Sequence, residues 1–161
     1  MPVRHPLEKK KVLAASKNGF FEIDFDTLQK QFVFQIDIDD DVRYNDGIKD
    51  SEGRLIIGTM GFPMVKEKTG KVFSYYNGQY KTIIENTTIS NGLAFSKDDR
   101  FLYFIDTPTK KVAKYHYNLK NGEVTFDSYV IEFKGKGSPD GMCIDNEGML
   151  WIAEWGGGCV S

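Results

Sequence analysis

Short runs of hydrophobic residues separated by polar turns make up most of this chain, and they predict β-strands. The runs lie at residues 12–15, 20–25, 32–36, 71–76, 80–84, 111–117 and 125–133. Asn77-Gly78 separates two of them and predicts a two-residue hairpin, because both central residues of a type I′ turn take positive φ. No stretch keeps an apolar period of 3.6 residues, so we expect little helix.

One motif occurs three times along the chain. Each copy begins with a polar residue and a glycine, passes through apolar residues to an acidic turn, and ends in an apolar strand. The copies span residues 45–59, 90–106 and 139–154. The residues just before the three glycines, Asp46, Asn91 and Asp140, are 45 and 49 positions apart. Internal repetition at this period is typical of repeat architectures.

Four short antiparallel strands within 45 to 49 residues match the size of one β-propeller blade. A sandwich or a closed barrel would not place the same polar-glycine motif at this period. We therefore predict an all-β fold, a β-propeller, of which 161 residues supply about three and a half blades of four-stranded antiparallel sheet.

Composition and charge narrow the class of protein further. The net charge of −2 argues against a nucleic-acid partner, because such proteins rely on positive charge. No run approaches 18 apolar residues, and the basic N-terminus lacks the apolar region of a signal peptide. Two cysteines do not make a disulfide framework. These features predict a cytoplasmic protein with neither a nucleic-acid nor a membrane partner.

The polar-glycine motifs are the best candidates for a functional site. The innermost strand of each blade lines the central channel of a propeller, so the motifs direct Asn45, Asn91 and Asp140 at one channel mouth. Converging oxygen donors suit a hard divalent cation, with Ca²⁺ and Mg²⁺ preferred and Mn²⁺ or Zn²⁺ as competitors. The alternative is that these residues only cap turns. Arg43 could bind a carboxylate or a sugar hydroxyl, or lie on the surface.

Other familiar catalytic chemistry has no support in the sequence. There is no phosphate-binding glycine loop followed by lysine, and no HExxH, CxxC or GxSxG motif. Cys143 lies in an expected inner strand and is interpreted as a buried small hydrophobe.

Several segments together resemble one known family. They are Arg43-Tyr44-Asn45-Asp46-Gly47, Gly58-Thr59-Met60, Ile89-Ser90-Asn91-Gly92-Leu93-Ala94, Tyr103-Phe104-Ile105-Asp106 and Pro139-Asp140-Gly141-Met142-Cys143-Ile144-Asp145. Their order and spacing resemble the senescence marker protein 30 family, which includes regucalcin, gluconolactonases and luciferin-regenerating enzyme. The resemblance implies a six-bladed propeller with one divalent metal in the channel, Ca²⁺ being the leading candidate, and enzymes that hydrolyse sugar lactones.

The resemblance also implies roles for individual residues. Asn91 and Asp140 match two protein ligands of the metal, and Arg43 and Asn45 match substrate-binding positions. Asp140 is in addition the candidate catalytic carboxylate that activates water. The family's third ligand, a glutamate in a Glu-Gly-Pro stretch of the first blade, has no counterpart in this chain. We therefore expect a fragment of a metal-dependent sugar-lactone hydrolase, weakly active or inactive alone; a calcium-binding or scaffolding propeller without catalysis is the alternative.

The resemblance sets the expected domain boundaries. Residues 1–10 do not match the family, and residues 11–161 form a partial propeller that is incomplete at both ends. An open propeller segment exposes unpaired sheet edges, which promote self-association.

Overall fold

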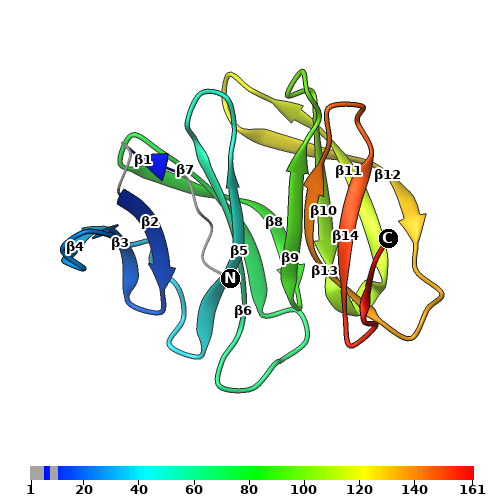
Figure 1. Ribbon diagram of the computed structural model, residues 1–161, viewed down its shortest axis with the longest axis horizontal. Helices are drawn as coiled ribbons and strands as arrows, with labels where there is room; N and C mark the ends of the chain where they lie inside the picture. Colours follow the sequence, from blue (N-terminus) through cyan, green and yellow to red (C-terminus); the bar gives the residue numbers. More distant parts are fainter. Residues whose placement is uncertain (1–5, 8–10) are drawn as a thin grey trace.

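The computed structural model describes residues 6–7 and 11–161, and these residues form four antiparallel sheets. The sheets follow one another along the chain, and Figure 1 shows them side by side, from the blue first sheet to the orange and red last one. The first sheet contains β1 (Pro6–Leu7), β2 (Lys11–Ser16), β3 (Gly19–Asp24) and β4 (Lys30–Phe34). The second contains β5 (Val42–Lys49), β6 (Leu55–Gly61), β7 (Gly70–Tyr76) and β8 (Gln79–Thr87).

The third and fourth sheets repeat this order. The third contains β9 (Ser90–Phe95), β10 (Phe101–Asp106), β11 (Lys111–Asn118) and β12 (Glu123–Glu132). The fourth has three strands, β13 (Ser138–Ile144), β14 (Leu150–Trp155) and β15 (Cys159–Val160). In every sheet the strands pair in chain order, so each sheet is an up-and-down meander of the kind that forms a propeller blade.

The predicted strands and turn are confirmed. Each predicted run overlaps a strand, although the runs at 20–25, 32–36 and 125–133 extend one or two residues past the strand ends. Asn77 and Gly78 join β7 to β8 with positive φ values of 50° and 79°. Helix is as scarce as expected: the described residues contain a single 3₁₀ turn, η1 (Thr107–Thr109). None of these residues belongs to a helix long and apolar enough to cross a membrane. Residues 1–5 and 8–10 lie outside the described residues, so the boundary expected at residue 11 stays a prediction.

The core consists of apolar layers between successive sheets. Ile56 and Val72 of the second sheet pack with Leu93, Leu102 and Phe104 of the third. A second layer joins the first and second sheets through Phe20, Leu55, Ile57 and Phe73, and a third joins the last two through Ile105, Val112 and Ile152. Sheets that are covered on both faces bury some strands completely: every residue of β6 and of β9 is buried.

Cys143 corrects one expectation, because it is exposed and not buried. It lies in β13 opposite Trp151, on the face of the fourth sheet that points away from the third. No described sheet covers that face, so a position that would be buried between two blades is open here.

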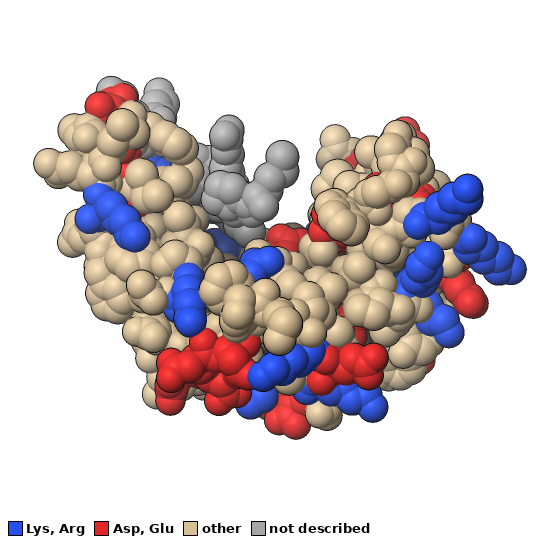
Figure 2. All heavy atoms as spheres, turned by 90° about the horizontal axis from the view of Figure 1, so that it is seen from below, with Lys and Arg blue, Asp and Glu red and all other residues tan. Residues whose placement is uncertain are grey.

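The four sheets give the molecule a curved outline. Figure 2 shows a crescent whose concave side lies between the flank of the first sheet and the flank of the last. Lysine, arginine, aspartate and glutamate are interspersed along the convex rim, so this view shows no broad patch of one sign. The strands β5, β9 and β13 contact one another in turn, and they begin the second, third and fourth sheets. They are therefore the inner strands.

Candidate cation and substrate site

Each inner strand carries a β-bulge at the polar-glycine motif. The pairing register shifts between Tyr44 and Gly47 in β5, and at the corresponding points of β9 and β13. Tyr44, Ser90 and Pro139, just before each bulge, pair with Thr59, Asp106 and Glu154 and lie 46 and 49 positions apart. Bulges redirect side chains and are common beside functional sites. Here they turn polar side chains of three strands toward one region.

This register corrects the repeat alignment by one residue. Asn45, and not Asp46, is the structural equivalent of Asn91 and Asp140, because each of the three directly follows the residue that pairs with Thr59, Asp106 or Glu154. Asp46 occupies the position that Gly92 and Gly141 hold in the other two repeats. The glycine of the first copy, Gly47, lies one position later, where the other two copies have Leu93 and Met142. Aligning the three motifs on their glycines therefore shifts the first copy by one residue.

The three equivalent residues line one cavity. A cavity of about 200 Å³ is lined by Asn45, Asp46, Asn91, Asp140, Gly141 and Ala153. Three of the four predicted site residues therefore meet, from three different sheets. Arg43 is not among the lining residues, but its guanidinium is hydrogen-bonded to Asn45.

Asn91 and Asp140 are in direct contact. The Asn91 amide Nδ2 donates a hydrogen bond to Asp140 Oδ1, and it also lies 3.2 Å from the hydroxyl oxygen of Thr107. That hydroxyl donates to the Pro139 carbonyl at 2.8 Å. Thr107 thus connects β9 to β13 through η1. Sequence reasoning missed this residue, because nothing in its local motif marks it.

Asn45 is fixed at both ends of its amide. Its Nδ2 donates to the Ser90 carbonyl at 2.9 Å, and its Oδ1 accepts from Arg43 Nη1 at 3.0 Å. The same Arg43 nitrogen donates to the Tyr44 carbonyl, also at 3.0 Å. Asn45 therefore ties β5 to β9 and holds the guanidinium of Arg43 close to the cavity.

Asp46 is the charged residue of this cavity that the predicted site did not include. Burial raises the pKa of its carboxyl, the negative charge of Asp140 raises it further, and a 2.8 Å hydrogen bond from the Gly47 N–H to Oδ1 opposes both. A carboxylate that is partly desolvated beside another carboxylate is a strong attractor for a cation.

The donor atoms around this cavity fit part of a hard-cation site. Asn91 donates through its nitrogen, which leaves its carbonyl oxygen available, and Asp140 uses only Oδ1 toward Asn91. Amide and carboxylate oxygens are the ligands that calcium and magnesium prefer. The described residues contain no group of three or more histidine, cysteine, aspartate or glutamate side chains that could hold a metal. The two aspartates and two asparagines are therefore a partial set.

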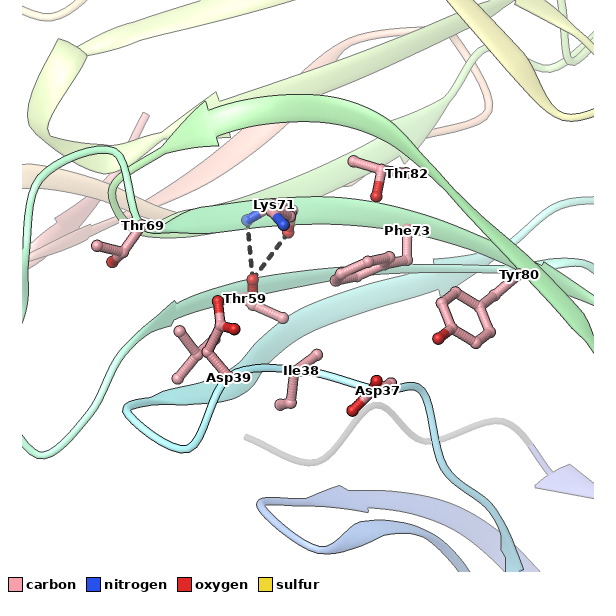
Figure 3. A pocket seen from close by; sticks show the side chains of 10 residues that line it. Asp37, Ile38, Asp39, Thr59, Thr69, Lys71, Phe73, Tyr80 and Thr82 are labelled. Carbon is pink, nitrogen blue, oxygen red and sulfur yellow. Dashed lines mark hydrogen bonds between the residues drawn. The ribbon is translucent and has the colours of Figure 1, made fainter.

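A larger cavity lies elsewhere and contains none of the predicted site residues. It measures about 350 Å³ and lies between the segment at residues 37–39 and the second sheet (Figure 3). Asp37, Asp39 and Phe73 are among its lining residues, and Thr59 bonds there to the backbone of Lys71. A groove of about 210 Å³ occupies the equivalent place between the second and third sheets. Such grooves recur because the chain crosses from one blade to the next at each of these places. The larger volume of the first cavity is therefore no reason to assign the functional site to it.

A curved row of antiparallel meanders, three with four strands and one with three, whose inner strands are bulged and polar, defines a segment of a β-propeller. The sequence profile described as "SMP-30/Gluconolactonase/LRE-like region" matches residues 3–161. The chain belongs to this family, as its motifs predicted.

Relatives agree with this assignment. Regucalcin of Xenopus laevis is 40% identical over 124 residues, which are 73% of this chain and 42% of that protein. Pentonolactonase XacC of Haloferax volcanii is 34% identical over 125 residues, 76% of this chain and 42% of that protein. The structure of the calcium-binding protein regucalcin from Agrobacterium tumefaciens superposes with a TM-score of 0.83 at 29% identity. The superposition covers 95% of this chain and 52% of that one.

The chain thus spans about half the length of these relatives. Its four sheets correspond to about half of a six-bladed propeller, which confirms the predicted fold.

Proposed function

We propose that this chain is part of a divalent-cation-dependent sugar-lactone hydrolase and supplies about half of its propeller. The observation that carries the proposal is the meeting of Asn45, Asn91 and Asp140 around one cavity, each from the bulge of a different inner strand. The relationship to a pentonolactonase and to a calcium-binding regucalcin supports the substrate class and the cation.

Asn91 and Asp140 would hold the cation through oxygen atoms, with Ca²⁺ as the leading candidate and Zn²⁺, Mg²⁺ or Mn²⁺ as alternatives. A bound divalent cation supplies polarisation of a carbonyl and stabilises the negative charge that develops on its oxygen. Because Asp140 Oδ1 accepts from Asn91, Oδ2 is the atom that would take a proton from the attacking water.

Arg43 and Asn45 would orient the sugar. Arg43 uses Nη1 for its bonds to Tyr44 and Asn45, and the described residues offer no partner to Nη2 or Nε. These N–H groups would donate to hydroxyls of the lactone. One N–H of the Asn45 amide is bonded to Ser90, and the other would donate to the substrate.

Binding of D-gluconate, the product of gluconolactone hydrolysis, tests the proposal without requiring full activity from half a propeller. Ligand-detected NMR with the purified chain and Ca²⁺ should show weak gluconate binding. Arg43→Gln should weaken it by about tenfold or more, because a charged donor is lost. Asp37→Asn, in the larger cavity, is the matched control and should leave it unchanged.

The same experiment separates the alternative function. Calcium binding without gluconate binding would favour a scaffolding propeller and contradict the lactonase. Hydrolysis of D-glucono-1,5-lactone by this chain should be slow at best, since the family's third ligand has no counterpart here. Robust turnover would contradict that expectation.

A further inference from the structure

A groove of about 350 Å³ lies between the second and third sheets, bordered by the turns that join β5 to β6, β7 to β8 and β11 to β12. It shares no lining residue with the 200 Å³ channel cavity. Each of the three cavities described above is lined by two acidic residues. Arg54, Lys81 and Lys120 line this groove instead, and none of its described lining residues is acidic. We call it the basic groove.

Arg54 presents a fixed guanidinium to the basic groove. Its side chain is only 6% exposed, and its Nη1 bonds to Asp50 and to the Tyr117 hydroxyl. Nη2 has only a long contact of 3.5 Å with the Lys120 carbonyl, and Nε has no partner in the part of the chain that the structure describes. The guanidinium carbon also lies 4.8 Å from the centre of the Tyr76 ring. The guanidinium is therefore held in place with N–H groups left to bind a ligand.

Ser74 adds a buried hydroxyl next to this guanidinium. It is 4% exposed and lines the basic groove, and its Oγ has no hydrogen-bond partner among the described residues. A Cβ on Gly122 would lie 2.6 Å from both Arg54 Nε and Ser74 Oγ, so these two atoms lie close together. The two donors are thus placed to bind one small acceptor group, and the missing side chain at Gly122 leaves the space beside them open.

The lysines give the basic groove its net charge. Lys81 Nζ lies 3.1 Å from Glu123 Oε1 in an exposed pair, and Asp50 balances the charge of Arg54. Lys120 is exposed and has no ion-pair partner among the residues that the structure describes. Lys120 therefore supplies the positive charge that no carboxylate compensates.

We propose that the basic groove binds a dianionic phosphate group, either free phosphate or the phosphate of a monoester. Arg54 and Ser74 donate to its oxygen atoms from the buried side, and Lys120 attracts it from the exposed side. The planar guanidinium matches the geometry of phosphate, and hydrogen bonds between charged groups are stronger than neutral ones. The groove has the volume of a small-molecule site, which leaves room for the rest of an ester.

Phosphorus NMR of inorganic phosphate mixed with the purified chain tests the proposal. A chelator keeps phosphate from binding through a cation in the channel, and at about pH 8 the phosphate group is mainly dianionic. The phosphate signal should broaden as the chain is added. Lys120→Gln and, separately, Ser74→Ala should each weaken the binding by about threefold or more, because each removes a donor.

Lys97→Gln is the matched control. Lys97 is also an exposed lysine of a hairpin turn, between β9 and β10, but it does not line the basic groove. Its substitution should leave phosphate binding unchanged, and circular dichroism checks that each variant is folded. D-Glucose 6-phosphate separates the two sources of the phosphate group: tighter binding than inorganic phosphate identifies a monoester, and equal binding identifies free phosphate.

Four outcomes would overturn the proposal. Absence of broadening with the wild-type chain would show that the groove does not hold phosphate. Binding that neither Lys120→Gln nor Ser74→Ala weakens would place the phosphate elsewhere, and loss of binding in Arg43→Gln would place it in the channel. Equal weakening by Lys97→Gln and Lys120→Gln would indicate attraction by surface charge without a defined site.

Discussion

At the scale of single residues, Asp46 is the side chain whose charge the fold disfavours. Burial and the neighbouring Asp140 raise the pKa of its carboxyl. A carboxyl whose pKa is higher in the folded state stabilises the fold at low pH, and that contribution is lost as the pH rises through the folded pKa. The charge of Asp46 therefore costs stability at neutral pH unless a cation neutralises it.

Asp46→Asn should accordingly raise the stability of the cation-free chain at neutral pH. The difference from wild type should disappear as the pH falls below the ordinary range for aspartate. Urea denaturation in the presence of a chelator, repeated across this range, measures it. A variant that is less stable at pH 7, or a difference that does not depend on pH, would show that Asp46 is not strained electrostatically.

Asp98 is the control, because its pKa is lowered in the folded state and its charge therefore stabilises the fold. The Ser96 hydroxyl donates to it and Arg100 bonds to it, which lowers the pKa of Asp98 to about 2. Its contribution to stability is present at neutral pH and is lost only as the pH falls toward that value. Asp98→Asn should therefore be less stable than wild type at pH 7, by an amount that shrinks in acid.

At the scale of elements, the close approach of inner strands β9 and β13 depends on one glycine. A Cβ at Gly92 would lie 2.6 Å from the Asp140 carbonyl oxygen and 2.8 Å from the Met142 Cβ. Both neighbours are fixed in β13, so neither can move aside at low cost. Gly92 therefore sets the distance between the strands that carry the two proposed cation ligands.

Gly92→Ala should lower the free energy of unfolding by about 1–3 kcal/mol, because it overpacks this contact. It should also weaken calcium binding, since Asp140 is displaced. Gly141→Ala is the matched control: a Cβ there meets no atom within 4 Å, so stability should change little. Equal effects of the two substitutions would contradict the role assigned to Gly92.

Sequence periodicity predicted most of the strands and their order, but not the two-residue strands β1 and β15. The hairpin at Asn77-Gly78 and the blade-sized repeat depend on local turn chemistry and on apolar runs, which are visible in the chain itself. The register at the bulges is not visible in the chain, because pairing with the next strand decides it. Thr107 and the exposure of Cys143 likewise depend on contacts between sheets. For the same reason the sequence could propose Asn45 as a site residue and still align Asp46, instead of Asn45, with Asn91 and Asp140.

At the scale of the whole molecule, a buried ionic network joins the second and third sheets. Arg54 Nη1 lies 2.6 Å from Asp50 Oδ2, and the Tyr117 hydroxyl donates to the same carboxylate oxygen at 2.7 Å. Arg54 also donates to the Leu119 carbonyl at 2.9 Å. Asp50 and Arg54 flank the turn after β5, whereas Tyr117 belongs to β11, so the network fixes one sheet relative to the other.

Arg54→Met should therefore cost about 3–5 kcal/mol of unfolding free energy, because it leaves the Asp50 carboxylate buried without its cation. The exposed pair of Arg100 and Asp98 is the control, and Arg100→Met should cost much less, because water screens that pair. Urea denaturation measures both. A loss at Arg54 as small as the one at Arg100 would show that the network does not couple the sheets.

Isothermal titration of the purified chain with Ca²⁺ tests most directly whether the inner strands form a cation site. We expect one weak site, with a dissociation constant of about 10⁻³ M, because the set of oxygen ligands is incomplete. Asp140→Asn should abolish the binding, and Asp39→Asn, in the larger cavity, should leave it intact. No binding by the wild-type chain, or equal binding by Asp140→Asn, would contradict the assignment of the channel residues.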